Sequence, residues 1–84
     1  KSLAIAWAAD GIRVNAIAPG FIVTQQSAKS RTDPAHVAAV SLRTPMGRWG
    51  QPDDIAGPAL FLASNAAAFM TGTCLAIDGG YSIA

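Results

Sequence analysis

The sequence has little that would tie it to metals, nucleic acids or membranes. It contains one cysteine, Cys74, and one histidine, His36, so it has neither an internal disulfide framework nor a His/Cys cluster with metal-ligand spacing. Charged residues make up only 13% of the 84 residues, and the basic ones are scattered, which disfavours nucleic acid and anionic membranes as partners. No apolar run approaches the roughly 18 to 20 residues of a spanning helix, and no stretch resembles a signal peptide. We therefore predict a cytoplasmic protein without a bound metal.

Apolar residues, in contrast, are abundant for so short a chain. They make up 51% of the sequence, whereas a domain of this size leaves a large share of its surface in water. We expect this apolar surface to be covered by further residues of the same domain or by neighbouring subunits. The first residues, K-S-L-A, carry neither an initiator methionine nor a capping signal, which predicts a chain that enters in mid-helix.

The stretch that organises the chain is I-R-V-N-A-I-A-P-G-F-I-V-T, residues 12–24. Residues 12–18 predict a buried strand of a parallel sheet, because β-branched residues recur there without clean polar alternation. The Pro19-Gly20 turn then stops the strand. Ligands of open α/β sheets bind just beyond the carboxyl ends of strands, and Gly20 has no Cβ to keep a flat ligand from the main chain. The turn is therefore a candidate binding site.

Other segments predict three helices and a second strand. Residues 2–9 are apolar on almost every side and are followed by a glycine that can form a C-cap. Thr32 or Asp33 can cap an amphipathic helix that begins at Pro34 and follows a polar loop, as a lid does. A third helix begins near Pro52. The run T-C-L-A-I, which precedes D-G-G, predicts a short strand, in which the thiol is packed rather than reactive.

Several polar residues have both a structural and a chemical interpretation. We expect Arg13 and Asn15 to be satisfied by backbone groups or water near the strand ends rather than by a ligand. Asp53 and Asp54 lie at the start of the third helix, where carboxylates stabilise the positive end of the helix dipole. We favour this role over metal binding or acid–base catalysis. His36 is interpreted as a surface residue rather than a proton carrier.

Several pieces of the chain, in this order and spacing, resemble the short-chain dehydrogenases/reductases. They are S-L-A-I-A-W-A-A-D-G-I-R-V-N-A-I-A-P-G-F-I-V-T, P-M-G-R-W-G-Q-P-D-D-I-A-G-P-A-L-F-L-A-S and F-M-T-G-T-C-L-A-I-D-G-G-Y. The resemblance implies an α/β fold, the C-terminal part of a Rossmann-like doubly wound parallel sheet in the order helix–strand–loop and lid helix–helix–strand. Residues 1–84 would then be the C-terminal segment of one dinucleotide-binding domain whose N-terminal half is absent.

The family's catalytic groups have no counterpart among these residues. Its Gly-rich phosphate loop, its catalytic Ser and its Tyr-x-x-x-Lys pair are all missing from the sequence, so no catalytic residue is assigned. Lys1 is interpreted as an exposed helix residue, because the resemblance places the catalytic lysine upstream of it. These 84 residues are therefore predicted to be inactive alone.

The resemblance implies that the loop after the Pro-Gly turn binds the nicotinamide of NAD or NADP. The main chain at Ile22 would hydrogen-bond the carboxamide, and the Thr24 hydroxyl would bond the carboxamide or a nearby phosphate. An amide ligand needs one donor and one acceptor at fixed separation, which extended backbone supplies. Thr24 can instead cap the segment that follows. The candidate cofactor-binding residues are Pro19, Gly20, Ile22 and Thr24.

The activity implied is hydride transfer between NAD or NADP and a small-molecule alcohol or carbonyl substrate. The run T-P-M-G-R-W-G-Q-P-D-D-I-A-G, together with D-G-G-Y-S-I, is most similar to sugar-acid members such as 2-deoxygluconate and gluconate dehydrogenases, followed by 3-oxoacyl-acyl-carrier-protein reductases. The resemblance also places the last strand at the sheet edge, which invites pairing with another chain and predicts a homo-oligomer, a dimer or tetramer. A noncatalytic dehydrogenase-like fragment, serving as a structural or oligomerisation module, is the alternative.

Overall fold

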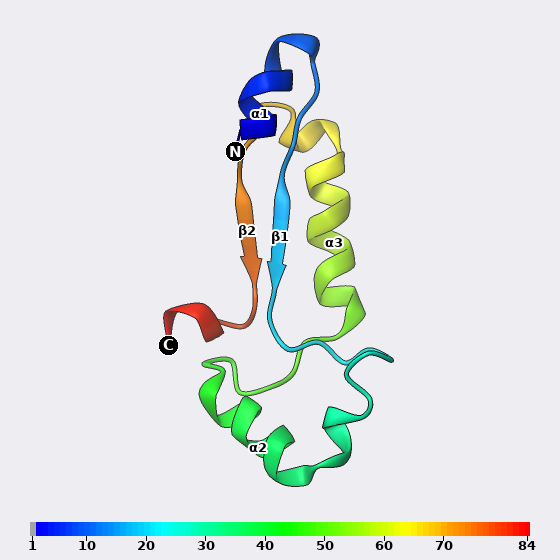
Figure 1. Ribbon diagram of the computed structural model, residues 1–84, viewed down its shortest axis with the longest axis vertical. Coiled ribbons are helices and arrows are strands. Elements are labelled where there is room, and N and C mark those ends of the chain that lie inside the picture. The colour runs from blue at the N-terminus through cyan, green and yellow to red at the C-terminus, as the bar shows by residue number, and fades with distance from the viewer. Residues whose placement is uncertain (1) are drawn as a thin grey trace.

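The computed structural model describes residues 2–84, so the interpretation of Lys1 lies outside the described residues. The chain forms an elongated body with principal extents of 49 × 24 × 20 Å. Two strands lie side by side at its centre, with one helix alongside and another beyond the ends of the strands (Figure 1). The main elements are α1 (Ser2–Trp7), β1 (Ala16–Pro19), α2 (Pro34–Arg43), α3 (Pro52–Ala63) and β2 (Cys74–Ile77). Short 3-10 turns cover Ala8–Asp10, Ser30–Thr32, Asn65–Ala67 and Tyr81–Ile83.

The two strands pair in parallel, as the sequence predicts for a Rossmann-like sheet. Ala16 lies opposite Cys74, and Pro19 lies opposite Ile77. The first strand is shorter and later than the predicted range 12–18, and Pro19 is its last residue instead of the residue that stops it. Because both strands point the same way, their carboxyl ends meet at one rim (Figure 1).

Side-chain hydrogen bonds explain why residues 12–15 lie outside the strand. The Val14 N–H donates to Thr71 Oγ1 at 3.0 Å. Arg13 Nη1 and Asn15 Nδ2 both donate to the Met70 carbonyl, at 3.3 and 3.1 Å, and Asn15 Oδ1 accepts the Thr73 N–H at 3.1 Å. Backbone groups thus satisfy both polar side chains, which confirms their structural interpretation.

Local signals place the helix boundaries correctly. Gly11 has φ of 75° and closes the turn after α1, as its position predicts. Asp33 is the N-cap of α2, because its Oδ1 accepts the Ala35 N–H at 3.0 Å. The Thr32 hydroxyl instead donates to the Lys29 carbonyl at 2.6 Å.

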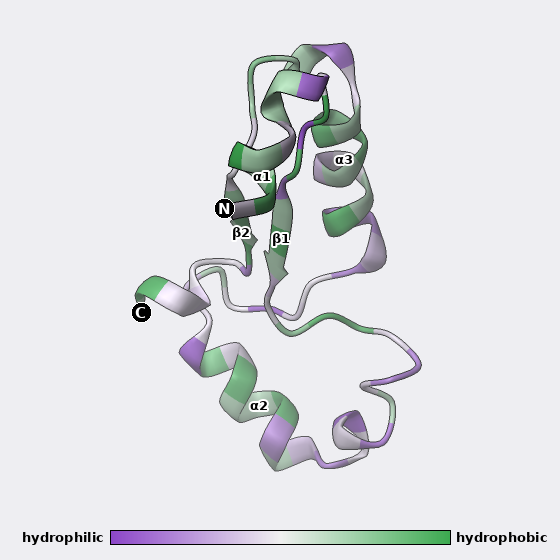
Figure 2. Cartoon of the chain, turned by 45° about the horizontal axis from the view of Figure 1, so that its top comes forward, coloured by the Kyte–Doolittle hydropathy of each residue, from purple (hydrophilic) through white to green (hydrophobic). Residues whose placement is uncertain are grey.

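Much apolar surface remains uncovered in this part of the chain. Only Ala4, Val40, Trp49, Leu62 and Ala67 form a buried apolar core. Large side chains such as Ile5, Leu60 and Phe69 are 80%, 72% and 104% exposed. Figure 2 shows hydrophobic residues along α1, both strands and α3. Many apolar side chains are thus left exposed by residues 2–84. This agrees with the prediction that so short a chain cannot bury all of its apolar surface.

Cys74 corrects one prediction about the sheet. It is a free and exposed residue and not the packed thiol that its alternation with Leu75 predicts. The strand burial pattern alternates as expected, with Leu75 half-buried. The difference arises because no element among residues 2–84 covers the face of β2 that carries Cys74.

Candidate functional site

The Pro-Gly turn lies at the carboxyl rim of the strand pair. The Gly20 N–H donates to the Ile77 carbonyl at 3.0 Å and so extends the parallel pairing by one step. A second, isolated parallel bridge joins Ile22 to Gly50. In this bridge, Gly50 N donates to the Phe21 carbonyl at 2.8 Å. The loop that follows the turn is therefore held between the end of β2 and Gly50, two residues before the start of α3.

The structure gives Gly20 a packing role that the sequence did not predict. A Cβ at this position would lie 2.7 Å from the Asp78 Cα and 2.8 Å from its Cβ. Real Cβ atoms do not approach other atoms so closely. The space left by the missing side chain is therefore taken by Asp78, the residue that follows β2.

The backbone of Ile22 offers a donor and an acceptor on the side away from Gly50. Within residues 2–84 its N–H has no hydrogen-bond acceptor. Its carbonyl accepts one hydrogen bond, from Ser27 Oγ at 2.8 Å, and a carbonyl oxygen has a second lone pair. Such a pair of groups matches the two hydrogen bonds of a primary amide.

Thr24 caps the turn that follows it, which is the alternative left open by the sequence. Its Oγ1 accepts the Ser27 N–H at 3.3 Å, and its own N–H donates to Ser27 Oγ at 3.0 Å. The Thr24 hydroxyl hydrogen is not used in these bonds, because Oγ1 acts there as an acceptor. Capping therefore leaves one donor of Thr24 for a further partner.

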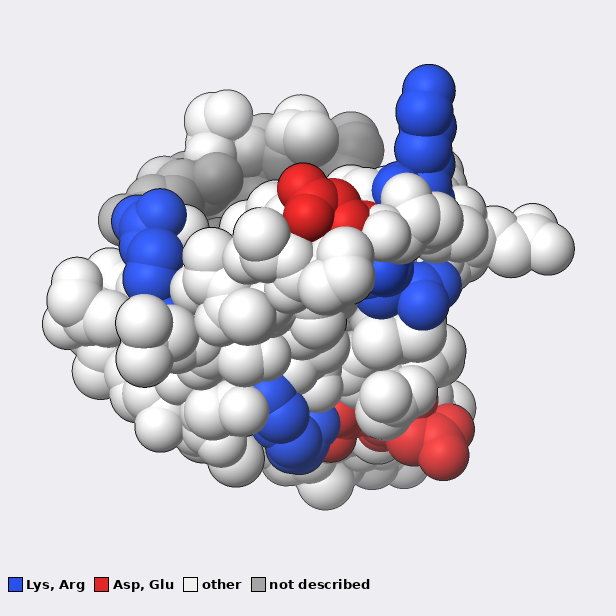
Figure 3. Space-filling view, turned by 90° about the horizontal axis from the view of Figure 1, so that it is seen from below, with Lys and Arg blue, Asp and Glu red and all other residues white. Residues whose placement is uncertain are grey.

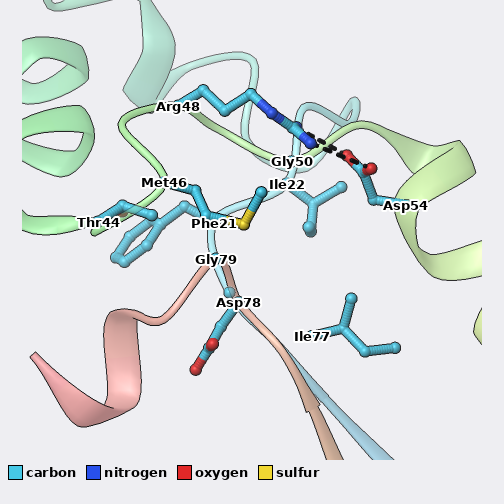
Figure 4. A pocket seen from close by; sticks show the side chains of 11 residues that line it. Phe21, Ile22, Thr44, Met46, Arg48, Gly50, Asp54, Ile77, Asp78 and Gly79 are labelled. Carbon is cyan, nitrogen blue, oxygen red and sulfur yellow. Dashed lines mark hydrogen bonds and ion pairs between the residues drawn. The ribbon is translucent and has the colours of Figure 1, made fainter.

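Three cavities adjoin the turn, and they differ in size. An open cavity of about 740 Å³ is lined by all four predicted site residues, Pro19, Gly20, Ile22 and Thr24. A second, of about 360 Å³, lies between the end of β1 and the chain that follows β2. The third has a volume of about 140 Å³ and lies between the loop, residues 44–50 and the end of β2 (Figure 4). Ligand sites typically occupy ~300–1,000 Å³. Two of the three cavities fall in this range, and of these the one of about 740 Å³ is lined by all four predicted residues.

An aromatic cluster joins α2 to the turn, and sequence reasoning missed it. Phe21 makes edge contacts with His36, Trp49 and Tyr81, with ring centroids 6.3, 5.5 and 5.1 Å apart. His36 also contacts Trp49 at 5.9 Å and is half-buried. The interpretation of His36 as a simple surface residue was therefore wrong, because its partners lie far away in the sequence.

An ion pair at the start of α3 supports the structural interpretation of Asp54. Arg48 Nη1 lies 2.9 Å from Asp54 Oδ2, and this oxygen also accepts the Gln51 N–H at 2.7 Å (Figure 4). The hydrogen bond from Arg48 and then that from Gln51 lower the pKa of Asp54 from 3.8 to about 2. Within residues 2–84, no group of three or more His, Cys, Asp or Glu side chains could hold a metal ion.

This pKa shift predicts how acid affects stability. Because the folded pKa of Asp54 lies below its unfolded value, the carboxylate stabilises the fold above about pH 4, and this contribution disappears as pH falls towards 2. Asp54→Asn should therefore lower the melting temperature at pH 6, and the difference from the unmodified protein should vanish near pH 2. Thermal unfolding of both proteins between these values measures the effect. Asp53→Asn, in the same helical turn, is the control, and an equal pH-dependent difference in both variants would contradict the prediction.

No helix in the described part of the chain is long and apolar enough to cross a bilayer. The face beneath α2 carries basic and acidic side chains at separate points rather than in one patch (Figure 3).

Comparison with known proteins shows what the chain is similar to. It is 52% identical over 81 residues to 2-dehydro-3-deoxy-D-gluconate 5-dehydrogenase from Bacillus subtilis, covering 96% of this chain and 32% of that protein. Galactitol 2-dehydrogenase (L-tagatose-forming) from Cereibacter sphaeroides is 49% identical over 83 residues, with coverages of 99% and 33%. The chain thus spans about a third of the length of these relatives.

A solved structure supports the fold. A crystal structure from Agrobacterium tumefaciens, named for an inferred 2-deoxy-D-gluconate 3-dehydrogenase activity and containing bound NADP, superposes with a TM-score of 0.95. The two are 50% identical, and the match covers 100% of this chain and 34% of that one. The chain therefore has the predicted fold class, part of a Rossmann-like doubly wound α/β sheet.

The family itself is shown over almost the whole chain. Residues 1–82 match the family described as enoyl-(acyl carrier protein) reductase. The parallel strand pair and the position of the Pro-Gly turn at its carboxyl rim agree with this match. The chain belongs to this family of short-chain dehydrogenases/reductases, as its motifs predict.

Proposed function

We propose that residues 1–84 are the C-terminal, nicotinamide-side segment of a longer NAD(P)-dependent oxidoreductase. The whole protein would transfer a hydride between NAD or NADP and an alcohol or carbonyl group. One observation carries the proposal: Pro19, Gly20, Ile22 and Thr24 line the same cavity of about 740 Å³ at the carboxyl rim of parallel strands. Ligands of open α/β sheets bind at this rim.

The residues present fit a nicotinamide carboxamide. The Ile22 N–H, which has no partner among residues 2–84, would donate to the carboxamide oxygen. The second lone pair of the Ile22 carbonyl would accept from the carboxamide NH₂, and the Thr24 hydroxyl would donate to the carboxamide or to a phosphate. The bound cofactor supplies the hydride chemistry, while these residues orient its ring. No residue of this chain is assigned to the proton transfer.

The substrate class is proposed from the relatives. The sugar-acid and polyol dehydrogenases favour a small, hydroxyl-rich substrate such as a sugar acid, with a 3-oxoacyl group as the second choice. We also propose a cytoplasmic homo-oligomer, a tetramer or a dimer. The exposed apolar side chains of α1 and α3, among them Leu3, Ile5 and Leu60, support an interface, because a soluble monomer rarely exposes so much apolar surface.

A noncatalytic structural or oligomerisation module is the second candidate. The same exposed apolar faces favour this role, because an interface needs no catalytic residue. The intact mass of the protein and its turnover with NAD or NADP distinguish the two. A mass equal to that of these 84 residues, without turnover, would exclude the enzyme and support the module.

The Thr24 hydroxyl provides the most direct test of cofactor binding. In the full-length protein, Thr24→Val should weaken the affinity for NAD or NADP by about three- to tenfold, because one hydrogen bond contributes ~0.5–1.5 kcal/mol. Thr24→Ser keeps the hydroxyl and should stay within about twofold of the unmodified protein. Calorimetric or fluorescence titration with the oxidised cofactor measures both.

Two controls separate binding from the capping role of Thr24. Thermal unfolding without cofactor reports any loss of the cap to Ser27. Titration with ADP-ribose, which lacks the nicotinamide, separates a carboxamide contact from a phosphate contact: the first leaves the ADP-ribose affinity unchanged, the second lowers it. Cofactor affinity that is the same in Thr24→Val and the unmodified protein would refute the proposed contact.

A further inference from the structure

We propose that Ser27 and Arg31 are positioning residues that fix the orientation of the Ile22 and Thr24 peptide groups toward the cofactor. This inference rests on the proposed function, because it concerns the same loop. Neither residue belongs to the predicted site, and neither would touch the nicotinamide carboxamide. Both act on the backbone that does.

The hydrogen bonds of the Ser27 hydroxyl are fully used within the chain. Its one hydrogen has two carbonyl acceptors within reach, that of Ile22 at 2.8 Å and that of Thr24 at 3.1 Å, and the shorter bond is to Ile22. Its oxygen accepts the Thr24 N–H at 3.0 Å and the Arg31 Nε–H at 3.0 Å. A hydroxyl has one donor and two acceptor sites, so all three are occupied. Ser27 is therefore not free to act on a substrate, and its geometry is set by three fixed partners.

Arg31 holds the same loop through a second bond. Its Nη2 donates to the Thr24 carbonyl at 2.9 Å, so one planar guanidinium binds both Ser27 and Thr24. Hydrogen bonds with a charged donor are stronger than neutral ones. Lysine could not reproduce this pair, because its ammonium is a point charge without the fixed fork. The loop between residues 24 and 31 is thus closed into a single hydrogen-bonded unit.

This unit determines which groups of Ile22 face the cavity. The Ser27 hydroxyl occupies one lone pair of the Ile22 carbonyl and leaves the other for a ligand. On the opposite side, the bridge to Gly50 holds the neighbouring peptide groups, with the Val23 N–H donating to the Gly50 carbonyl at 2.9 Å. The Ile22 peptide is therefore restrained from two directions before any ligand binds. Restraint of this kind lowers the entropic cost of binding, because the loop is already ordered before the ligand arrives.

The test compares two cofactors that differ only in the group that Ile22 would bind. In the 3-acetylpyridine analogue of NAD or NADP, a methyl group replaces the carboxamide NH₂, so the bond to the Ile22 carbonyl cannot form. In the full-length protein, Ser27→Ala should raise the Kd of the natural cofactor about tenfold and that of the analogue less than about threefold. Ser27→Thr retains the hydroxyl and should restore the natural affinity. A purely structural effect would weaken both cofactors equally.

Two further variants complete the design. Ser30→Ala is the matched control, because its hydroxyl bonds only the Ser27 backbone carbonyl, at 3.0 Å, and its effect should be below twofold. Arg31→Met removes the fork while leaving the Ser27 hydroxyl in place, so it repeats the comparison if Ser27→Ala fails to fold. Arg31→Met should also raise the Kd of the natural cofactor more than it raises the Kd of the analogue.

The outcomes distinguish this inference from the proposed function. If the unmodified protein binds neither NAD nor NADP, or binds the natural cofactor and its analogue equally, the proposed carboxamide contact fails and the inference fails with it. If the unmodified protein discriminates between the two but Ser27→Ala and Arg31→Met lower both affinities equally, only the inference is overturned. A Ser30→Ala effect as large as that of Ser27→Ala would also overturn it.

Discussion

Gly80→Ala is expected to lower the free energy of unfolding by about 2–5 kcal/mol, the largest effect among the substitutions proposed for this chain. Gly80 has φ of 91°, a conformation that residues with a Cβ rarely adopt. A Cβ there would also lie 2.9 and 3.1 Å from two atoms of the Pro45 ring. Backbone strain and steric overlap therefore add, and the ring cannot rotate away as a flexible side chain could. Chemical denaturation of the full-length protein measures the loss.

Gly11→Ala separates the two contributions. Gly11 has φ of 75°, but nothing lies within 4 Å of the position that its Cβ would take. This variant therefore carries the backbone strain alone, about 1–2 kcal/mol. Equal losses in the two variants would contradict the steric part of the prediction and show that Pro45 can move. A larger loss for Gly80→Ala would show that it cannot.

The contact with Pro45 is one of several that join the end of α2 to the end of the sheet. The Met46 N–H donates to the Gly79 carbonyl at 3.0 Å, and the Arg43 guanidinium lies over the Tyr81 ring, 5.4 Å from its centroid. The end of α2 is thus fixed to the chain that follows β2.

Features that depend on a few neighbouring residues were predictable from the sequence. The start of α2 at Asp33 and Pro34, the start of α3 at Pro52 and the turn at Gly11 all follow from backbone preferences and capping groups that act within one helical turn. The parallel pairing of the strands follows from their composition. These signals do not depend on the rest of the protein.

Features that depend on distant residues were not predictable in the same way. No sequence signal near Gly20 predicts its close contact with Asp78. Likewise, no signal near His36 predicts its contacts with the rings of Phe21 and Trp49. Such pairs are created by the meeting of the two carboxyl ends and by the return of the chain through residues 44–50. The start of β1 was predicted too early for a related reason. The Val14 N–H donates to the Thr71 hydroxyl instead of to a main-chain carbonyl of the neighbouring strand.

Gly20→Ala tests whether the turn is built for the sheet or for the ligand. The added methyl would meet the Asp78 backbone at 2.7 Å, and backbone atoms can relieve the overlap only by moving the end of a strand. We expect a loss of about 2–3 kcal/mol in unfolding free energy, at the upper end of the range for overpacking. Gly57→Ala is the control, since no atom lies within 4 Å of its added Cβ. It should stabilise α3 by about 0.5–1 kcal/mol through helix propensity alone.

Gly20→Ala also tests the loop of residues 20–24, which is proposed to bind the cofactor. If the shift of Gly20 is transmitted to Ile22, the affinity of the full-length protein for NAD or NADP should fall together with its stability. Titration at a temperature where the variant is still folded separates these effects. A variant with unchanged stability would show that the contact with Asp78 is not the reason for this glycine. In that case, close approach of a ligand to the main chain would be the reason instead, and a loss of cofactor affinity alone would be its signature.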